Sequence, residues 1–217
     1  MDGLRSNKEF AGFEPVVTIL LGTGMRVGEC LGLRWYDVDM ENRKIYVKHS
    51  LTYAKFKGDE CAKRHITKTK TSKSVRMIPM TEMVYNSFLK QYEYQCITGF
   101  YQGSIDGYTD FIFLNERGDV LLPAAINSFL ERARKVINQE QMEIARREGT
   151  QPVEIPHFHN HILRHTFCTR CAEAEVPIDV LMRLTGHTRM STLVEYYIDV
   201  SDDRLEDYVD FLNNKIV

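Results

Sequence analysis

Five of the seven histidines in the chain fall within residues 157–187, and this concentration is the first indication of a chemical site. Within it, His161 and Arg164 stand three residues apart, so that on a helix both side chains project from one side. An imidazole and a guanidinium placed together can bind the oxygens of a single phosphate group. The alternative is structural: His161 and His165 cap or fill a helix, and Arg164 pairs with a buried carboxylate.

A second guanidinium occurs in the glycine-rich stretch 23–29, which reads TGMRVGE. Arg26 stands in this stretch at a predicted junction between two helices. Glu29 follows one helical turn later, where its carboxylate can orient the Arg26 side chain. A second candidate ligand for the same phosphate is therefore available.

Residues 63–76 form a basic run without a single acidic residue. The chain as a whole carries 28 Lys and Arg against 30 Asp and Glu, a net charge of -2, so that no global positive field attracts a polyanion. Any site for nucleic acid must then be local, and a positive hairpin could contact a phosphate backbone. The alternative is an ordinary solvated face. The cations of the run are Lys63, Arg64, Lys68, Lys70, Lys73 and Arg76.

Taken together, these segments resemble the catalytic domain of the tyrosine recombinases, the phage-integrase family. The resemblance runs from about Phe13 to the C-terminus, and it is strongest to integrases of conjugative transposons and phages of Gram-positive bacteria. The matching segments follow the family's order. They are Thr23–Glu29, Lys70–Pro79, His161–His165, Leu184–His187 and Tyr197.

The resemblance implies a role for each matching residue. Its catalytic set would comprise Arg26 and Arg164 as clamps on the scissile phosphate, Glu29 as their support, Lys70 as the acid, His161 as the base, His187 as a phosphate ligand and Tyr197 as the nucleophile. Lys73 is the second choice for the acid, and Tyr196 stands one residue short of the expected spacing. The residues predicted to contact DNA are Lys68, Lys73, Arg76 and Arg64.

Elementary chemistry is consistent with these roles. Fixed guanidinium groups stabilise the charge that accumulates on phosphate oxygens in the transition state. A phenol has a pKa of about 10 and needs a base as it attacks, and the alkoxide that leaves needs a proton. The resulting phosphotyrosine keeps the bond energy, so rejoining requires neither ATP nor a metal, and no cofactor is expected. The sequence contains neither a P-loop nor a paired-carboxylate metal motif.

Hydrophobic periodicity predicts the elements that must position these residues. Helices are expected from Phe13 to a stop at Gly22–Gly24, around Val27–Leu31, from Thr81 to about Ile97 and from Leu122–Pro123 onward. The stretch 139–154 is expected to be an insertion that lengthens the last of these. Alternating polar and apolar residues at 44–48 and 74–78 predict a small antiparallel sheet. The stretch 99–109 is predicted to be a loop. Three short helices and a terminal one follow Pro156.

The predicted fold class is therefore α+β, mainly α-helical, with a small antiparallel β-sheet near the N-terminal third. We expect residues 1–217 to form a single catalytic domain, without N-terminal core-binding and arm-binding domains and with reduced DNA affinity. No apolar run near the N-terminus is long enough for a signal or membrane segment, which favours a cytoplasmic protein without a membrane partner.

The resemblance implies double-stranded DNA as the partner and a homo-oligomer, a tetramer, on that DNA. It also implies that a tail helix at 201–217 packs into a neighbouring protomer, and packing on its own domain is the alternative. Three rival functions remain: a metal hydrolase using His157, His159 and His161, a non-catalytic DNA-binding module and a type IB topoisomerase. A redox or zinc site at Cys168 and Cys171 is a less well supported alternative, because no second Cys/His pair at the required spacing accompanies them.

Overall fold

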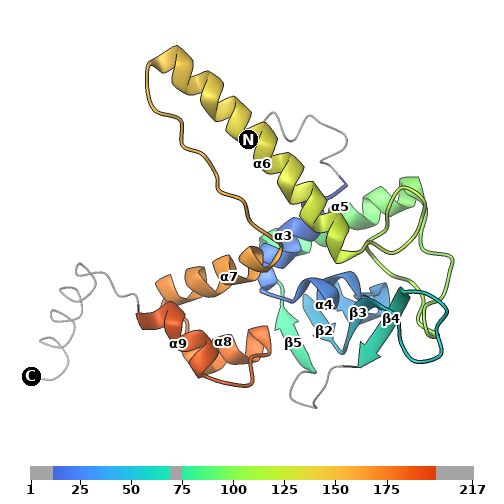
Figure 1. Cartoon of the computed structure of the whole chain (residues 1–217). Helices are drawn as coiled ribbons and strands as arrows, with labels where there is room; N and C mark the ends of the chain where they lie inside the picture. Colours follow the sequence, from blue (N-terminus) through green and yellow to red (C-terminus); the bar gives the residue numbers. More distant parts are fainter. Residues whose placement is uncertain (1–11, 69–74, 199–217) are drawn as a thin grey trace, which may run out of the picture.

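A computed structural model describes residues 12–68 and 75–198 of the chain (Figure 1). Helices dominate it, as predicted, and the strands of the described residues lie between residues 37 and 82. The helices are α3 (Glu14–Thr23), α4 (Val27–Leu31), the 3-10 turn η1 (Trp35–Asp37), α5 (Glu82–Thr98), α6 (Pro123–Glu148), α7 (His161–Glu173), α8 (Ile178–Thr185) and α9 (Ser191–Ile198). The strands are β1 (Val38–Asp39), β2 (Lys44–Val47), β3 (His49–Ala54), β4 (Lys63–Lys68) and β5 (Arg76–Pro79).

The predicted helix boundaries in the first half of the chain are confirmed. Helix α3 ends at Gly24, which adopts the left-handed conformation with φ +61° that favours glycine. Helix α5 begins after Thr81, whose hydroxyl accepts a hydrogen bond from the backbone N–H of Val84 at 3.4 Å. Helix α3 packs against both α5 and α7 and so joins the two halves of the chain.

The strands form two small sheets where the sequence predicted one. Strand β2 pairs with β1 and β5 in an antiparallel sheet, with Ile45 opposite Ile78. Strands β3 and β4 form a separate antiparallel hairpin. The sequence predicts the basic run as a hairpin between the strands at 44–48 and 74–78, and it does not predict β3 or β4 as strands. The charged residues of the run concealed the burial of His65 and the packing of Ile66 against the hydrophobic core. The first half of the run is thus itself a strand.

Helix α4 packs directly against strand β3 through two glycines. A Cβ atom on Gly28 would come within 2.6 Å of the Leu51 carbonyl oxygen, and one on Gly32 within 2.9 Å of the Leu51 backbone nitrogen. Backbone cannot yield as a flexible side chain can, so these positions require glycine. This contact holds the β3–β4 hairpin beside the short helix that follows Arg26.

The hydrophobic core has a main part and a smaller part. The main part includes Phe88, Phe111 and Ile126, which are fully buried. The smaller part lies under α7, α8 and α9 and is built on Cys168, Leu181 and Leu193. The helices of the smaller cluster carry the histidine-rich segments, and Figure 1 shows them grouped at one end of the molecule.

Helix α6 extends out of the body and the chain returns along it (Figure 1). Asn138 fastens the returning segment by two hydrogen bonds to the backbone of Ile155, at 2.9 and 3.0 Å. The expected lengthening of this helix by the stretch 139–154 is confirmed, since the helix continues to Glu148. The predicted loop at 99–109 is also confirmed. The tail helix predicted at 201–217 lies outside the described residues.

Replacing Gly28 by alanine should destabilise the domain by about 1–3 kcal/mol, because the new methyl group overlaps the backbone of Leu51. Urea unfolding followed by circular dichroism would measure the loss as a lower midpoint at unchanged slope. Gly12→Ala is the matched control, since its Cβ meets only the Tyr94 hydroxyl at an ordinary 3.6 Å. Equal midpoints for the two variants would contradict the packing described for α4 and β3.

Candidate active site

The junction between α3 and α4 positions Arg26. Gly24 lies so close to α7 that a Cβ atom would be 2.3 Å from the ring of Phe167. Two residues later Arg26 begins α4 with extended backbone, and its side chain remains 45% exposed. The glycine-rich stretch therefore brings the start of α4 against α7 and leaves one guanidinium at the surface.

Glu29 is the carboxylate around which this part of the site is built. Its two oxygens accept hydrogen bonds from the backbone N–H and the Nη1 of Arg26, at 2.9 and 3.0 Å. The same oxygens receive Arg76, with Nη2 at 2.7 Å and Nη1 at 3.2 Å. Burial by itself would raise the pKa of Glu29, but the contacts with Arg76 and then Arg26 outweigh it, and the net pKa is lowered. Glu29 is thus ionised at neutral pH, as the predicted supporting role requires.

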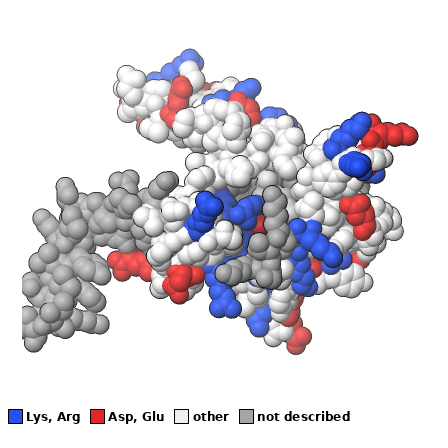
Figure 2. All heavy atoms as spheres, turned by 60° about the horizontal axis from the view of Figure 1, so that its bottom comes forward, with Lys and Arg blue, Asp and Glu red and all other residues white. Residues whose placement is uncertain are grey.

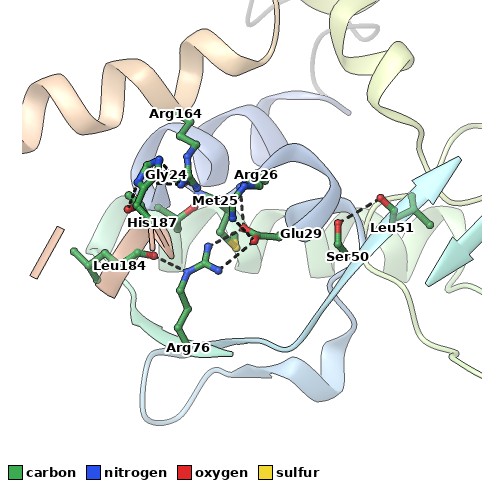
Figure 3. A network of polar contacts seen from close by, with 12 residues as sticks. Gly24, Met25, Arg26, Glu29, Ser50, Leu51, Arg76, Arg164, Leu184 and His187 are labelled. Atoms are coloured by element: carbon green, nitrogen blue, oxygen red, sulfur yellow. Dashed lines mark hydrogen bonds and ion pairs between the residues drawn. The ribbon is translucent and has the colours of Figure 1, made fainter. Parts of the chain in front are cut away.

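Arg164 enters the site from helix α7 and is 8% exposed. Its Nη1 donates to the carbonyl oxygen of Gly24 at 2.7 Å, which links α7 to the junction that carries Arg26. Burial, and next the charge of Arg26, lower the pKa of Arg164 to about 10. The guanidinium still carries its charge at neutral pH, and Figure 3 shows it beside Gly24 and His187.

The hydrogen bonds around His187 define its tautomer. The hydroxyl of Thr185 donates its proton to the Leu181 carbonyl oxygen at 2.6 Å, so it can only accept from His187 Nδ1 at 2.7 Å. This assigns the ring proton to Nδ1. Arg164 Nη2 lies 3.0 Å from Nε2 and 3.2 Å from Nδ1, and of these two nitrogens only Nε2 then has a lone pair that can accept its hydrogen. Burial, followed by the charges of Arg164 and Arg26, lowers the pKa of His187 to about 4. The imidazole is therefore neutral at physiological pH.

The structure brings together four of the residues predicted from sequence: Arg26, Glu29, Arg164 and His187 (Figure 3). Their elements are the α3–α4 junction, α7 and the turn after α8. On the face turned forward in Figure 2, Lys and Arg gather across the middle, whereas Asp and Glu lie mostly toward the margins. The local positive surface that the sequence required is present.

The position of Arg76 corrects its prediction as a surface contact with DNA. Its side chain is 3% exposed, and besides Glu29 it bonds the Leu184 carbonyl oxygen through Nε at 2.7 Å. Arg64 is likewise engaged, with Nε donating to the Val120 carbonyl oxygen at 2.9 Å. A run of cations in sequence does not distinguish a solvated side chain from one paired with a distant carboxylate. Lys68, at the end of β4, remains exposed.

The other predicted site residues divide between described and undescribed parts of the chain. His161 is exposed at the start of α7, one turn before Arg164. Lys70 and Lys73 lie outside the described residues. Tyr197 belongs to α9, but its side chain lies outside the described part of the structure.

Sequence reasoning assigned no contact to Tyr196 and His165, which the structure joins. The Tyr196 hydroxyl is hydrogen bonded to Nδ1 of His165, the residue after Arg164. Tyr196 also packs on the small cluster of Cys168, Leu181 and Leu193. The sequence indicated this contact only indirectly: Tyr196 precedes the predicted site residue Tyr197, and His165 follows the predicted site residue Arg164.

The histidines and cysteines that suggested a metal or redox function are arranged differently in the structure. His157 is bonded to Glu131 at 3.0 Å and packs edge to face on His159. Across residues 12–68 and 75–198, no three His, Cys, Asp or Glu side chains are grouped so that they could hold a metal ion. Burial raises the pKa of Cys168 to about 11, so this thiol is unreactive.

Comparison with known proteins agrees with the fold and the site. Residues 9–204 match the phage integrase family, and the chain belongs to that family. The transposase from transposon Tn916 of Enterococcus faecalis is 29% identical over 199 residues, which cover 92% of this chain and 45% of that protein. A tyrosine recombinase XerC-like protein of Caldanaerobacter subterraneus is 26% identical over 92% of this chain and 48% of its own length.

Among solved structures, the Tn1549 transposon integrase in complex with circular intermediate DNA matches with a TM-score of 0.81 and 30% identity. The match covers 97% of this chain and 63% of that one. The chain thus spans about half the length of the curated relatives it matches. In the described parts of the chain, no helix has the length and apolarity needed to cross a membrane.

The stability contributed by His187 should depend on pH in a defined direction. Its pKa of about 4 in the folded protein lies below the ordinary 6.5, so between these values the unfolded chain binds more protons. The contribution is complete above pH 6.5 and is lost as the pH falls toward 4. The free energy of unfolding of wild type minus that of His187→Gln should therefore increase from pH 4 to 6.5.

Urea unfolding at several pH values measures this difference, and NMR titration of the imidazole measures the pKa directly. A difference independent of pH, or an imidazole that titrates near 6.5, would contradict the buried neutral tautomer.

Proposed function

We propose that this chain is the catalytic domain of a site-specific DNA recombinase that cleaves and rejoins strands through a 3'-phosphotyrosine. The observation that carries the proposal is the convergence of Arg26, Arg164 and His187 on the face where cations gather. The buried Glu29 holds Arg26, and Arg164 bonds both the Gly24 carbonyl oxygen and His187. Membership of the phage integrase family supports it, as does the likeness to an integrase solved in complex with DNA.

The proposed chemistry begins at the scissile phosphate. Arg26 and Arg164 bind its non-bridging oxygens and stabilise the charge that develops on them. His187 bonds a further phosphate oxygen, for which it must present an N–H in place of the Nε2 lone pair that now faces Arg164. The negative charge of the phosphate favours that change, because it raises the pKa of a neighbouring imidazole.

The tyrosine oxygen then attacks phosphorus, and the bond from phosphorus to the 5'-oxygen breaks. We assign the base to His161 and the proton for the departing 5'-oxygen to Lys70, with Lys73 as the alternative. The products are a 3'-phosphotyrosine and a free 5'-hydroxyl. A 5'-hydroxyl of a second strand reverses the step, so the reaction balances without ATP or a metal.

Two adjacent tyrosines of α9 compete for the role of nucleophile. The resemblance in sequence favours Tyr197. A specific contact favours Tyr196, whose hydroxyl bonds His165 in the manner of a nucleophile and its base. The same contact would also serve to hold α9 on α7, so a direct chemical test must decide between them.

The proposal extends to partners and place of action. Double-stranded DNA is the substrate, and strand exchange between two sites requires more than one copy of the domain, which we propose acts as a homo-oligomer, a tetramer, on DNA. A protein that acts on bacterial DNA would do so in the cytoplasm.

A nicked suicide substrate tests the reaction class and the nucleophile together. Wild type should form a covalent adduct with DNA that survives a denaturing gel, and Tyr197→Phe should not, because phenylalanine has no hydroxyl to attack phosphorus. Tyr196→Phe serves as the matched control. Loss of the adduct in Tyr196→Phe alone would move the nucleophile by one residue. Tight DNA binding by wild type without any adduct would favour the non-catalytic DNA-binding module. Relaxation of supercoiled DNA without strand transfer between two DNA sites would favour a topoisomerase.

Arg164→Lys should lower the single-turnover rate of adduct formation by roughly 100-fold or more, because lysine cannot reproduce the bidentate geometry of a guanidinium. The matched control is Arg170→Lys on the same helix. The Arg170 side chain is 77% exposed and forms an ion pair with the exposed Glu173. It should cleave at the wild-type rate. An equal loss in both variants would point to damage to helix α7 as the cause.

A further inference from the structure

Arg76 connects two segments of the site that are far apart in sequence. It stands at the start of β5, and all three of its guanidinium nitrogens make hydrogen bonds. Two nitrogens hold the Glu29 carboxylate, and the third holds the Leu184 carbonyl oxygen in the last turn of α8 (Figure 3). With 3% of its side chain exposed, Arg76 cannot itself reach a DNA phosphate in this arrangement.

On one side, Arg76 determines where Arg26 lies. The Glu29 carboxylate receives Arg76 from the buried side and Arg26 from the exposed side. A carboxylate held by two parallel N–H···O bonds cannot rotate freely, so the oxygen that Arg26 contacts is fixed in place. The orientation of the exposed guanidinium therefore depends on a residue that is itself remote from solvent.

On the other side, Arg76 determines where His187 lies. Gly186 adopts φ +72°, and a Cβ atom there would be 3.0 Å from Arg76 Nη1 and 3.2 Å from Cζ. The turn that ends α8 is thus packed on the guanidinium as well as bonded to it through Leu184. His187 follows directly and contacts Arg164.

We propose that Arg76 is a positioning residue that sets the distance between Arg26 and His187 across the phosphate site. This inference rests on the proposed function, because it is the transition state of phosphate attack that needs this spacing. A misplacement of a catalytic group by about 1 Å can cost 100-fold in rate. DNA affinity, which many phosphate contacts share, should change little.

The test compares Arg76→Lys with wild type in cleavage and in binding. Lysine keeps the charge beside Glu29 but cannot bond the carboxylate and Leu184 at once. The single-turnover rate of adduct formation should fall 10- to 100-fold, while the dissociation constant for DNA stays within about threefold. Arg43→Lys, at an exposed ion pair with Glu82, is the matched control and should match wild type in both measurements.

The salt dependence of binding separates positioning from direct contact. Losing one phosphate contact lowers the slope of log K against log salt by about 0.9. Arg76→Met should leave this slope unchanged. A lower slope would mean that Arg76 touches DNA, and it would overturn the inference.

The remaining outcomes are also decisive. If wild type forms an adduct and folded Arg76→Lys cleaves at the same rate, the positioning role is wrong and the proposed function stands. If wild type forms no adduct, both fail. Should the single variants not fold, the double variant Glu29→Leu with Arg76→Leu replaces the buried pair by apolar side chains. It should fold and cleave slowly, and cleavage at the wild-type rate would again overturn the positioning role.

Discussion

The ion pair between Glu29 and Arg76 is the interaction on which the rest of the site depends. An isolated carboxylate at this depth would be costly to ionise, and its pKa is lowered only because two guanidinium groups share it. The pair is therefore stable as a unit and costly to break at either end. It links the first residue of β5, which is the last residue of the basic run, to the short helix that follows Arg26, and the bond from Arg76 to Leu184 adds helix α8.

A second constraint follows from the density of positive charge. Arg26 and Arg76 bind one carboxylate, that of Glu29, and Arg164 lies close enough to interact with it electrostatically. Burial, and next the charges of Arg164, Arg26 and Arg76, keep His187 neutral. Three guanidinium groups and one carboxylate give this set of residues a net positive charge, which is the electrostatic state that a phosphate diester would complete.

Hydrophobic packing connects α7, which carries Arg164, and α8, which precedes His187, to helix α9. The small hydrophobic cluster of Cys168, Leu181 and Leu193 joins α7, α8 and α9, and Tyr196 packs against it. This cluster is separate from the main core, so the described side chains of α9 are held by the small cluster together with the bond from Tyr196 to His165. Elements stabilised so locally are those that can move at lowest cost. This property would suit the role proposed for α9, which carries both candidate nucleophiles.

The sequence by itself determined the family, the helical character and most of the residues that converge in the candidate site, because these depend on local spacing. These local patterns are a glycine-rich turn, a pair of residues three apart on a helix and a capping threonine. Each involves residues within a few positions of one another, so it can be recognised in the sequence. The tertiary structure alone decided the role of Arg76, the second sheet and the contact between Tyr196 and His165. The contacts of Arg76 and of Tyr196 join residues distant along the chain, whereas the strands of the second sheet follow one another in sequence and their charged residues conceal the pairing. Only burial reveals whether a cation is solvated or paired. Arg76 looked like part of a basic surface until the fold placed Glu29, 47 residues away, against it.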